Sequence, residues 1–287
     1  GCMLSGNTFV NAPTGSLMFA MGKNVANEKV YGDISKMIHL LVAGSSGSGK
    51  SVFLGSLIIS LIYKYSPEEL RLILIDPKKT EFVLYNNLPH LMINEIITDV
   101  HKAIQSLNWA IGEMNRRYTL FEQMSRAGTY VVNIDEYNSH LSEGEEKLPK
   151  IVIIIDELAD LMLAAKKDVE DRIQNLTQKA RAAGIHLIVA TQRPSADVIT
   201  GVIKGNLPTR IAFAVAAEVD SRVILDQTGA QKLLGKGDFL YTMSGINTPV
   251  RVQSAFISSE ESAVFLTDAV TALSGSTALL AMRRTTA

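Results

Sequence analysis

The chain has 287 residues, of which 47% are hydrophobic and 20% are charged, and its formal net charge is −1. This composition is typical of a globular protein with one large or two small domains, and no window approaches the ~20 consecutive apolar residues of a membrane-spanning helix. The near-neutral charge excludes a uniformly basic exterior for nucleic-acid binding, and the single cysteine, Cys2, excludes an internal disulfide.

The first informative segment is a run of glycine and serine between two apolar stretches. It follows the apolar residues 38–43 and precedes residues 52–62, which are typical of an apolar helix. The run has the spacing of a phosphate-binding P-loop, in which backbone N–H groups surround phosphates, a lysine reaches the β- and γ-phosphates, and a serine hydroxyl ligates Mg²⁺. The alternative is a linker that matches by chance, which the flanking strand and helix disfavour. We therefore predict that ATP is bound by Gly44, Ser45, Ser46, Gly47, Ser48, Gly49, Lys50 and Ser51, with Ser51 on the Mg²⁺ ion.

Apolar runs alternate with helix-period segments along the following chain, which predicts an α/β fold with a mostly parallel sheet and helices on both faces. Residues 70–75 are expected to be a core strand. Residues 126–149 lose the periodicity and are expected to be a surface excursion. Between them, seven apolar residues recur at spacings of three and four, which favours the core-facing stripe of a long helix over a coiled coil: Val100, Ile104, Leu107, Ile111, Met114, Tyr118 and Phe121.

A second motif consists of five β-branched residues followed by two carboxylates. Residues 151–155 predict a strand buried on both faces, and Asp156 and Glu157 follow at its carboxyl end, where α/β folds bind ligands. Asp156 fits a residue that holds the water shell of Mg²⁺, and Glu157 fits the base that activates the attacking water. By itself the pair could equally cap a helix. The P-loop about 105 residues earlier favours the catalytic interpretation.

A third buried strand is predicted at residues 184–191, and it too ends in polar residues. Gln192 follows this strand, where a side chain next to the P-loop would contact the γ-phosphate and the attacking water. The alternative is an ordinary turn residue. His186, near the start of the strand, is expected to be a packed residue rather than a metal ligand.

Taken in order, these segments resemble the motor domain of the FtsK/SpoIIIE family of DNA translocases, from about residue 17 to about residue 262. The resemblance rests on many short motifs along the chain, which lie at residues 39–51, 74–78, 113–118, 133–138, 155–160, 179–186, 190–195, 203–204, 208–213, 220–222, 224–227, 234–235 and 249–251. It implies a RecA-like P-loop ATPase that assembles as a homo-hexameric ring around double-stranded DNA and moves it. The implied role is chromosome segregation at bacterial division or sporulation.

The resemblance also implies a domain organisation and a location. Residues 1–22 would be a lead-in left from a preceding subdomain, residues 23–275 the motor domain, and residues 276–287 a tail. The membrane-spanning region and the winged helix of the family lie outside this sequence, which is expected to be an excised motor core or the product of a reduced gene. A full-length protein would act at the cytoplasmic face of the bacterial inner membrane, whereas this chain is expected to be soluble and cytoplasmic.

Roles for several arginines and a lysine follow from the same resemblance. In ring ATPases a neighbouring subunit supplies an arginine to the transition state, and Arg181 is the first candidate here, with Arg210 second. Arg181 could instead pair with a carboxylate of its own helix. Phosphate contacts to DNA are expected from Arg193, Lys204 and Arg222.

Two alternatives to a DNA motor remain at this point. One is the related ATPase module of protein-secretion machines, which shares the P-loop core and moves polypeptide. The other is a nucleotide-dependent assembly module without turnover, against which the presence of Glu157 argues.

Overall fold

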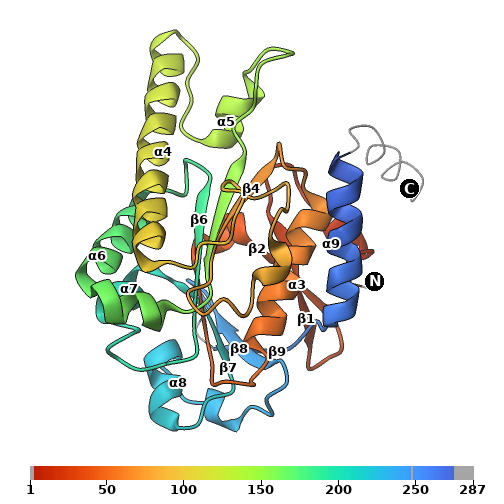
Figure 1. Cartoon of the computed structure of the whole chain (residues 1–287), viewed down its shortest axis with the longest axis vertical. Coiled ribbons are helices and arrows are strands. Elements are labelled where there is room, and N and C mark those ends of the chain that lie inside the picture. The colour runs from red at the N-terminus through yellow and green to blue at the C-terminus, as the bar shows by residue number, and fades with distance from the viewer. Residues whose placement is uncertain (1–2, 247, 275–287) are drawn as a thin grey trace.

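The computed structural model describes residues 3–246 and 248–274, and these form a central sheet between two layers of helices (Figure 1). The helices are α1 (Asn7–Val10), α2 (Ile34–Met37), α3 (Lys50–Lys64), α4 (Val100–Arg126), α5 (Ile134–Ser139), α6 (Leu158–Lys179), α7 (Gly201–Asn206), α8 (Glu218–Leu225) and α9 (Ser259–Ser274). The strands are β1 (Met18–Asn24), β2 (Lys29–Asp33), β3 (Leu40–Ala43), β4 (Leu70–Ile75), β5 (Lys150–Ile155), β6 (Ile185–Thr191), β7 (Thr209–Phe213), β8 (Asp238–Thr242) and β9 (Val250–Ser254). Two short 3₁₀ helices complete the assignment, η1 (Val83–Tyr85) and η2 (Ala230–Lys232).

The strands form one sheet in the order β2-β1-β9-β8-β7-β3-β6-β5-β4. Strands β7, β3, β6, β5 and β4 are parallel, which confirms the predicted parallel core. Strands β8, β9, β1 and β2 extend it by antiparallel pairing. This extension was not predicted. Strands β2, β8 and β9 are short and partly exposed, and the apolar start of β1 does not indicate which strands it pairs with. The expected boundary at residue 22 falls inside β1, which pairs on both sides of that point.

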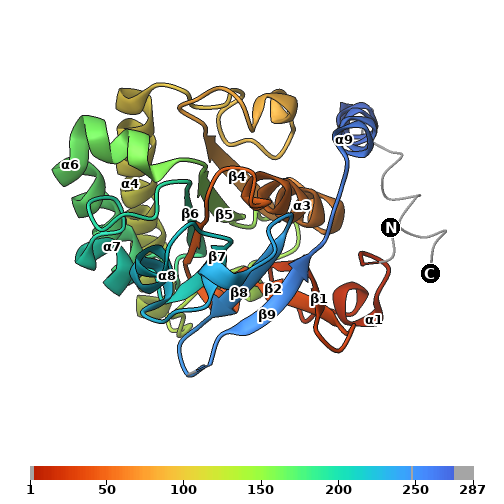
Figure 2. The ribbon, with the colours of Figure 1, turned by 90° about the horizontal axis from the view of Figure 1, so that it is seen from below.

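Side chains of the parallel strands alternate between two hydrophobic cores, one on each face of the sheet. In β5, Ile151, Ile153 and Ile155 enter the core beneath α4 and α6. The intervening Val152 and Ile154 enter the core beneath α3. Figure 1 shows α4, α6 and α7 on one face and α3 and α9 on the other, and Figure 2 shows the same layers from below. A strand buried on both faces has to be apolar throughout, as β5 is.

The long amphipathic helix predicted from the stripe of seven apolar residues is confirmed as α4. Leu107 and Met114 are fully buried against the sheet and α6, and Phe121 packs in a smaller cluster near α5. Asp99 caps the amino end of the helix, and its carboxylate accepts a hydrogen bond from the N–H of Lys102 at 2.9 Å. Among the described residues, no helix combines the length and the apolarity needed to span a bilayer.

The segment 126–149 contains one short helix, α5, and is tied to the main body by a small apolar cluster. Val131 and Ile134 are buried in this cluster with Phe121 of α4. Most of the remaining side chains between residues 139 and 147 are exposed. The excursion therefore covers the start of β6 with one end and reaches solvent with the other. The expected tail at residues 276–287 lies outside the described residues.

Candidate nucleotide site

The glycine-rich loop at residues 44–49 connects the carboxyl end of β3 to the first turn of α3. Gly47 and Gly49 have φ angles of 75° and 107°, a left-handed region that disfavours residues with a Cβ atom. A Cβ on Gly49 would lie 2.4 Å from the backbone N of Gly237, whereas a Cβ on Gly47 would meet nothing within 4 Å. The loop is thus packed tightly at its base and open at its tip, as phosphate binding requires.

Neighbouring segments hold this loop through its main chain. The N–H of Gly44 donates to the carbonyl of Thr191 at 3.3 Å, and the N–H of Ser45 donates to the carbonyl of Ala214 at 2.9 Å. In return, the carbonyl of Ser48 accepts from the N–H of Gly237 at 2.8 Å. Support of the loop by the turn before β8 could not be predicted from local spacing, because this contact depends on the antiparallel part of the sheet.

Lys50, the first residue of α3, contacts the first carboxylate of β5. Its ammonium group donates to Oδ1 of Asp156 at 2.9 Å and to the carbonyl oxygen of the same residue at 2.9 Å. The two side chains are 2% and 0% exposed. Burial raises the pKa of Asp156 above its usual value, although the charge of Lys50 opposes the shift. The structure therefore brings together the P-loop lysine and the predicted metal-binding carboxylate.

Three buried oxygens near the loop have no hydrogen-bond partner among the described residues. They are Oδ2 of Asp156, Oδ1 of Asp76 and Oγ of Ser48. Buried polar groups are normally paired, so oxygens left open beside a phosphate loop fit a cation and a phosphate that complete them. Ser51 lies in the first turn of α3 and is partly buried. The donor set fits ATP with Mg²⁺, and Asp76, which sequence reasoning treated only as a strand end, belongs to its surroundings.

Glu157 is fully buried and is held by four donors. The hydroxyl of Thr191 lies 2.6 Å from Oε1, and the N–H of Gln192 lies 3.1 Å from Oε2. The ammonium of Lys78 lies 3.2 Å from Oε2, and the N–H of Ala159 lies 3.3 Å from Oε1. Burial lowers the pKa of Lys78, but the negative charge of Glu157 raises it. The net result is a pKa above the usual lysine value. Glu157 caps α6 as well, so the two interpretations left open by the sequence are compatible.

Sequence reasoning missed Lys78 and Thr191 as neighbours of this carboxylate. Lys78 follows β4 and Thr191 ends β6, and these two strands flank β5 in the sheet. The signal available was that all three strands end in polar residues, which parallel packing brings to one edge. Gln192 contacts Glu157 through its main chain, while its own side chain is partly buried. A contact of the Gln192 side chain with the γ-phosphate stays a prediction.

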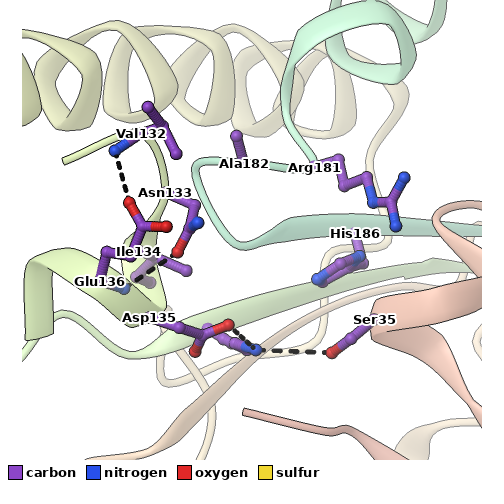
Figure 3. A pocket seen from close by; sticks show the side chains of 10 residues that line it. Ser35, Val132, Asn133, Ile134, Asp135, Glu136, Arg181, Ala182 and His186 are labelled. Atoms are coloured by element: carbon purple, nitrogen blue, oxygen red, sulfur yellow. Dashed lines mark hydrogen bonds and ion pairs between the residues drawn. The ribbon is translucent and has the colours of Figure 1, made fainter. Parts of the chain in front are cut away.

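Arg181 lies at the opposite, amino edge of the parallel strands. It follows the end of α6 and is exposed, and its side chain makes no hydrogen bond or ion pair with any residue in the described part of the chain. It borders a cavity of about 580 Å³, lined by Ser35, Val132, Asn133, Ile134, Asp135, Glu136, Lys150, Arg181, Ala182 and His186. Figure 3 shows the Arg181 side chain beside His186, across the cavity from Glu136. The alternative in which Arg181 pairs with a carboxylate of its own helix has no support in this geometry.

Arg210 is engaged within the chain. Its guanidinium lies 2.5 Å from Oδ2 of Asp226 and also donates to the carbonyl of Lys204 at 3.0 Å. Its side chain is 15% exposed. These contacts favour Arg181 over Arg210 as a residue free to reach another subunit.

The three residues expected at DNA differ in their surroundings. Arg193 is exposed, and its side chain has no hydrogen bond or ion pair among the described residues. The Nζ atom of Lys204 lies 2.6 Å from Asp226, and the guanidinium of Arg222 lies 2.8 Å from Glu218. Of the three, Arg193 is the residue whose charge has no carboxylate partner among the described residues.

The loop between β3 and α3 and the carboxylates at the end of β5 define the class of protein, which is an α/β P-loop ATPase fold. A family model described as FtsK/SpoIIIE family matches residues 6–196. The chain belongs to the FtsK/SpoIIIE family.

Curated relatives agree with this assignment. The chain is 57% identical over 261 residues to the DNA translocase FtsK of Clostridium tetani, which covers 90% of this chain and 34% of that protein. It is 52% identical over 256 residues to the DNA translocase SpoIIIE of Bacillus subtilis, which covers 87% of this chain and 32% of that protein. The chain thus spans about a third of the length of the curated relatives it matches.

Solved structures show the same fold. The conjugation coupling protein TcpA, in a monomer form with ATPγS, matches with a TM-score of 0.71 and 27% identity over 91% of this chain and 72% of that one. The cytoplasmic domain of the type VII secretion ATPase EccC from Thermomonospora curvata matches with a TM-score of 0.74 and 22% identity over 88% of this chain and 31% of that one. The second likeness concerns the fold alone.

Proposed function

We propose that this chain is the ATP-hydrolysing motor of a double-stranded DNA translocase, which works as a ring hexamer in bacterial chromosome segregation at division or sporulation. Its place of action would be the cytoplasmic face of the inner membrane. The proposal is supported by membership of the FtsK/SpoIIIE family and by the similarity to proteins named DNA translocases.

The observation that supports assembly of several copies is the separation of Arg181 from the proposed catalytic carboxylate, while the number six is taken from the family resemblance. Strand β6 has seven residues, so its two ends lie about 20 Å apart. Thr191 at one end contacts Glu157, and Arg181 precedes the other end. An arginine so placed cannot reach the nucleotide of its own chain. It would reach the nucleotide of an adjacent chain if the amino edge of one copy faced the P-loop of the next.

Each residue of the carboxyl edge would have a separate role in ATP hydrolysis. Lys50 would exchange its contact with Asp156 for the phosphates, to which the open loop at residues 44–49 leads. Mg²⁺, held by Ser51 and Asp156, would supply positive charge that offsets the phosphates. Glu157 would accept the proton of the attacking water, and the side chain of Gln192 would contact the γ-phosphate.

Contacts to DNA would be made through phosphates and would not depend on sequence. Arg193 is exposed and available, whereas Lys204 and Arg222 would first have to exchange their carboxylate partners for phosphates. A contact of this kind releases counterions from DNA, so it weakens steeply with salt. Such contacts suit a motor that steps along any duplex.

The alternative is an ATPase module of a protein-secretion machine. It is supported by the fold shared with EccC, at 22% identity. The 57% identity to a DNA translocase favours the DNA motor.

The test is the rate of ATP hydrolysis against added duplex DNA at about 50 mM and about 200 mM salt. We expect hydrolysis to rise with duplex at the lower salt, and the apparent affinity for duplex to fall steeply at the higher salt. Arg193→Ala should lower the slope of log affinity against log salt by about one. Arg126→Ala, which removes an exposed arginine of α4, is the matched control. A rate that is indifferent to duplex at both salts would refute the DNA motor and favour the secretion module.

A further inference from the structure

Thr191 lies where three functional segments meet. It ends β6 and is fully buried, and its carbonyl oxygen accepts the hydrogen bond of Gly44 at the start of the P-loop. Its hydroxyl lies 2.6 Å from Oε1 of Glu157 and accepts a hydrogen bond from the N–H of Arg193 at 3.0 Å. One side chain therefore touches both the proposed catalytic base and the residue proposed to contact DNA.

The direction of these bonds follows from the single proton of the hydroxyl. Two acceptors lie within reach of it, Oε1 of Glu157 at 2.6 Å and the carbonyl of Arg193 at 3.4 Å. The bond to the carboxylate is shorter and charge-assisted, so the proton goes to Glu157. The N–H of Gln192 supplies a second donor at 3.1 Å from the other oxygen. Two of the four residues that donate to this carboxylate are therefore consecutive residues at the end of β6.

The chain that follows is folded onto the core rather than hanging free. The N–H groups of Val198 and Ile199 donate to the carbonyl of Ser195 at 3.1 Å and 2.8 Å. Both side chains are buried in the core beneath α6 and α7. Arg193, Ala196 and Asp197 are the exposed residues of the segment 193–200. A displacement of Arg193 would therefore act on the hydroxyl of Thr191 through a hydrogen bond from the main chain of Arg193 itself.

We propose that Thr191 is a positioning residue that orients Glu157 according to the position of the segment 193–200, so that duplex DNA bound at Arg193 raises the rate of ATP hydrolysis. This inference rests on the proposed function. It places the coupling of DNA binding to hydrolysis in two hydrogen bonds of one hydroxyl group. The P-loop contact of the same residue uses its carbonyl oxygen, so a change of side chain leaves that contact in place.

The experiment compares Thr191→Val, which keeps the branched shape and loses the hydroxyl, with Thr191→Ser, which keeps the hydroxyl. The measured quantities are kcat and KM for ATP with and without saturating duplex, and the affinity for a fluorescent non-hydrolysable ATP analogue. We expect Thr191→Val to lower the duplex-stimulated kcat about tenfold. The ratio of stimulated to unstimulated kcat should fall toward one, while analogue affinity and KM stay within about twofold. Thr191→Ser should recover most of the ratio.

Thr209→Val is the matched control, because Thr209 is also a buried strand threonine. Its hydroxyl donates to the carbonyl of Met37 at 3.0 Å, away from Glu157. This variant should keep the wild-type ratio. Thr191→Ala, measured in parallel, gives the same test should the valine side chain disturb folding.

The outcomes separate the two proposals. A wild-type protein that responds to duplex, with a Thr191→Val protein that responds equally, would overturn the inference alone. Loss of analogue affinity in both Thr191→Val and Thr191→Ser would also overturn it, since the role would then be structural. A wild-type ratio of one would overturn the proposed function itself.

Discussion

The carboxyl and amino edges of the parallel sheet differ in whether their basic side chains are paired with carboxylates. At the carboxyl edge, Lys50 and Lys78 contact the buried carboxylates Asp156 and Glu157, and buried oxygens remain open beside the phosphate loop. At the amino edge, Arg181 extends into solvent beside a cavity and has no ion pair among the residues described. The lysines beside the carboxylates of the proposed nucleotide site are thus paired with them, whereas the Arg181 side chain at the amino edge has no ion pair within the described residues.

This difference suggests that neither edge is complete within one chain. Lys50 and Lys78 contact carboxylates in this structure, and in the proposed mechanism Lys50 would move to the phosphates. An arginine from another copy would add further positive charge at the transition state. We propose Arg181 as that arginine, since the length of β6 separates it from the nucleotide site of its own chain. The contrast between the edges thus gives an electrostatic reason for assembly.

The strongest test of the contrast is a mixture of two inactive variants. Arg181→Ala should lower the rate of ATP hydrolysis about 10³-fold or more, since arginine fingers contribute about 10³ to 10⁵. Glu157→Gln should be inactive for lack of a base. In a one-to-one mixture, about a quarter of the interfaces would pair an intact Glu157 with an intact Arg181, so activity should reappear.

A control for the loss of an arginine accompanies the mixture experiment. Arg126→Ala removes an exposed arginine that pairs within α4, and it should leave the rate unchanged. If no mixing ratio restores hydrolysis, the two edges do not meet and the composite site is wrong.

A second test concerns the carboxyl edge alone. Lys50→Ala should lower the rate about 10² to 10³-fold, because a donor aimed at the phosphates is lost. It also leaves Asp156 buried without its partner, so the nucleotide-free protein should lose about 3–5 kcal/mol of unfolding free energy. Hydrolysis assays and urea unfolding measure the two effects. Lys147→Ala, in the exposed excursion, is the control, and a Lys50→Ala protein with normal duplex-stimulated turnover would contradict the site.

The smallest effect belongs to the amino edge and depends on pH. Burial lowers the pKa of His39 from 6.5 to about 3, with a further contribution from His186, and burial lowers the pKa of His186 to about 4. Below pH 6.5 the two imidazoles become protonated in the unfolded chain, whereas they stay neutral in the folded chain until the pH approaches their lowered pKa values. Stability should therefore be fully present above pH 6.5 and fall by about 1.4 kcal/mol per pH unit for each histidine as the pH drops toward 4.

Urea unfolding at pH 7, 6 and 5 measures this slope. His186→Asn should reduce it by about half, and His101→Gln, at an exposed position of α4, should leave it unchanged. Stability that does not vary between pH 7 and pH 5 would show that the two rings are not held neutral.

The sequence was most informative where a local pattern is sufficient to specify a structure. The P-loop between β3 and α3, the doubly buried strand β5 and the stripe of α4 were all predictable, because spacing alone determines which side chains share a face. The antiparallel strands β1, β2, β8 and β9 were missed. Three of them are short and partly exposed, and the pairing of β1 with β9 joins segments near opposite ends of the chain, such as Gly22 and Ser254.

The residues of the proposed nucleotide site also fall into those predictable from motifs and those assigned only by the fold. Lys50, Asp156 and Glu157 could be found from motifs, but Lys78 and Thr191 could not be assigned to Glu157. Their roles depend on the strand order β6-β5-β4, and a sequence does not state which strands are neighbours. The support of the P-loop by Gly237 is another contact that only the folded chain reveals.

The sequence by itself determined that this protein has a P-loop, a pair of carboxylates after a buried strand, and an arginine before the next strand. Only the tertiary structure decided that the carboxylates meet Lys50, Lys78 and Thr191 at one edge of the sheet while Arg181 lies at the other. The reason is physical. Motifs follow from local spacing, whereas the meeting of segments follows from strand order and burial, which the whole chain sets together.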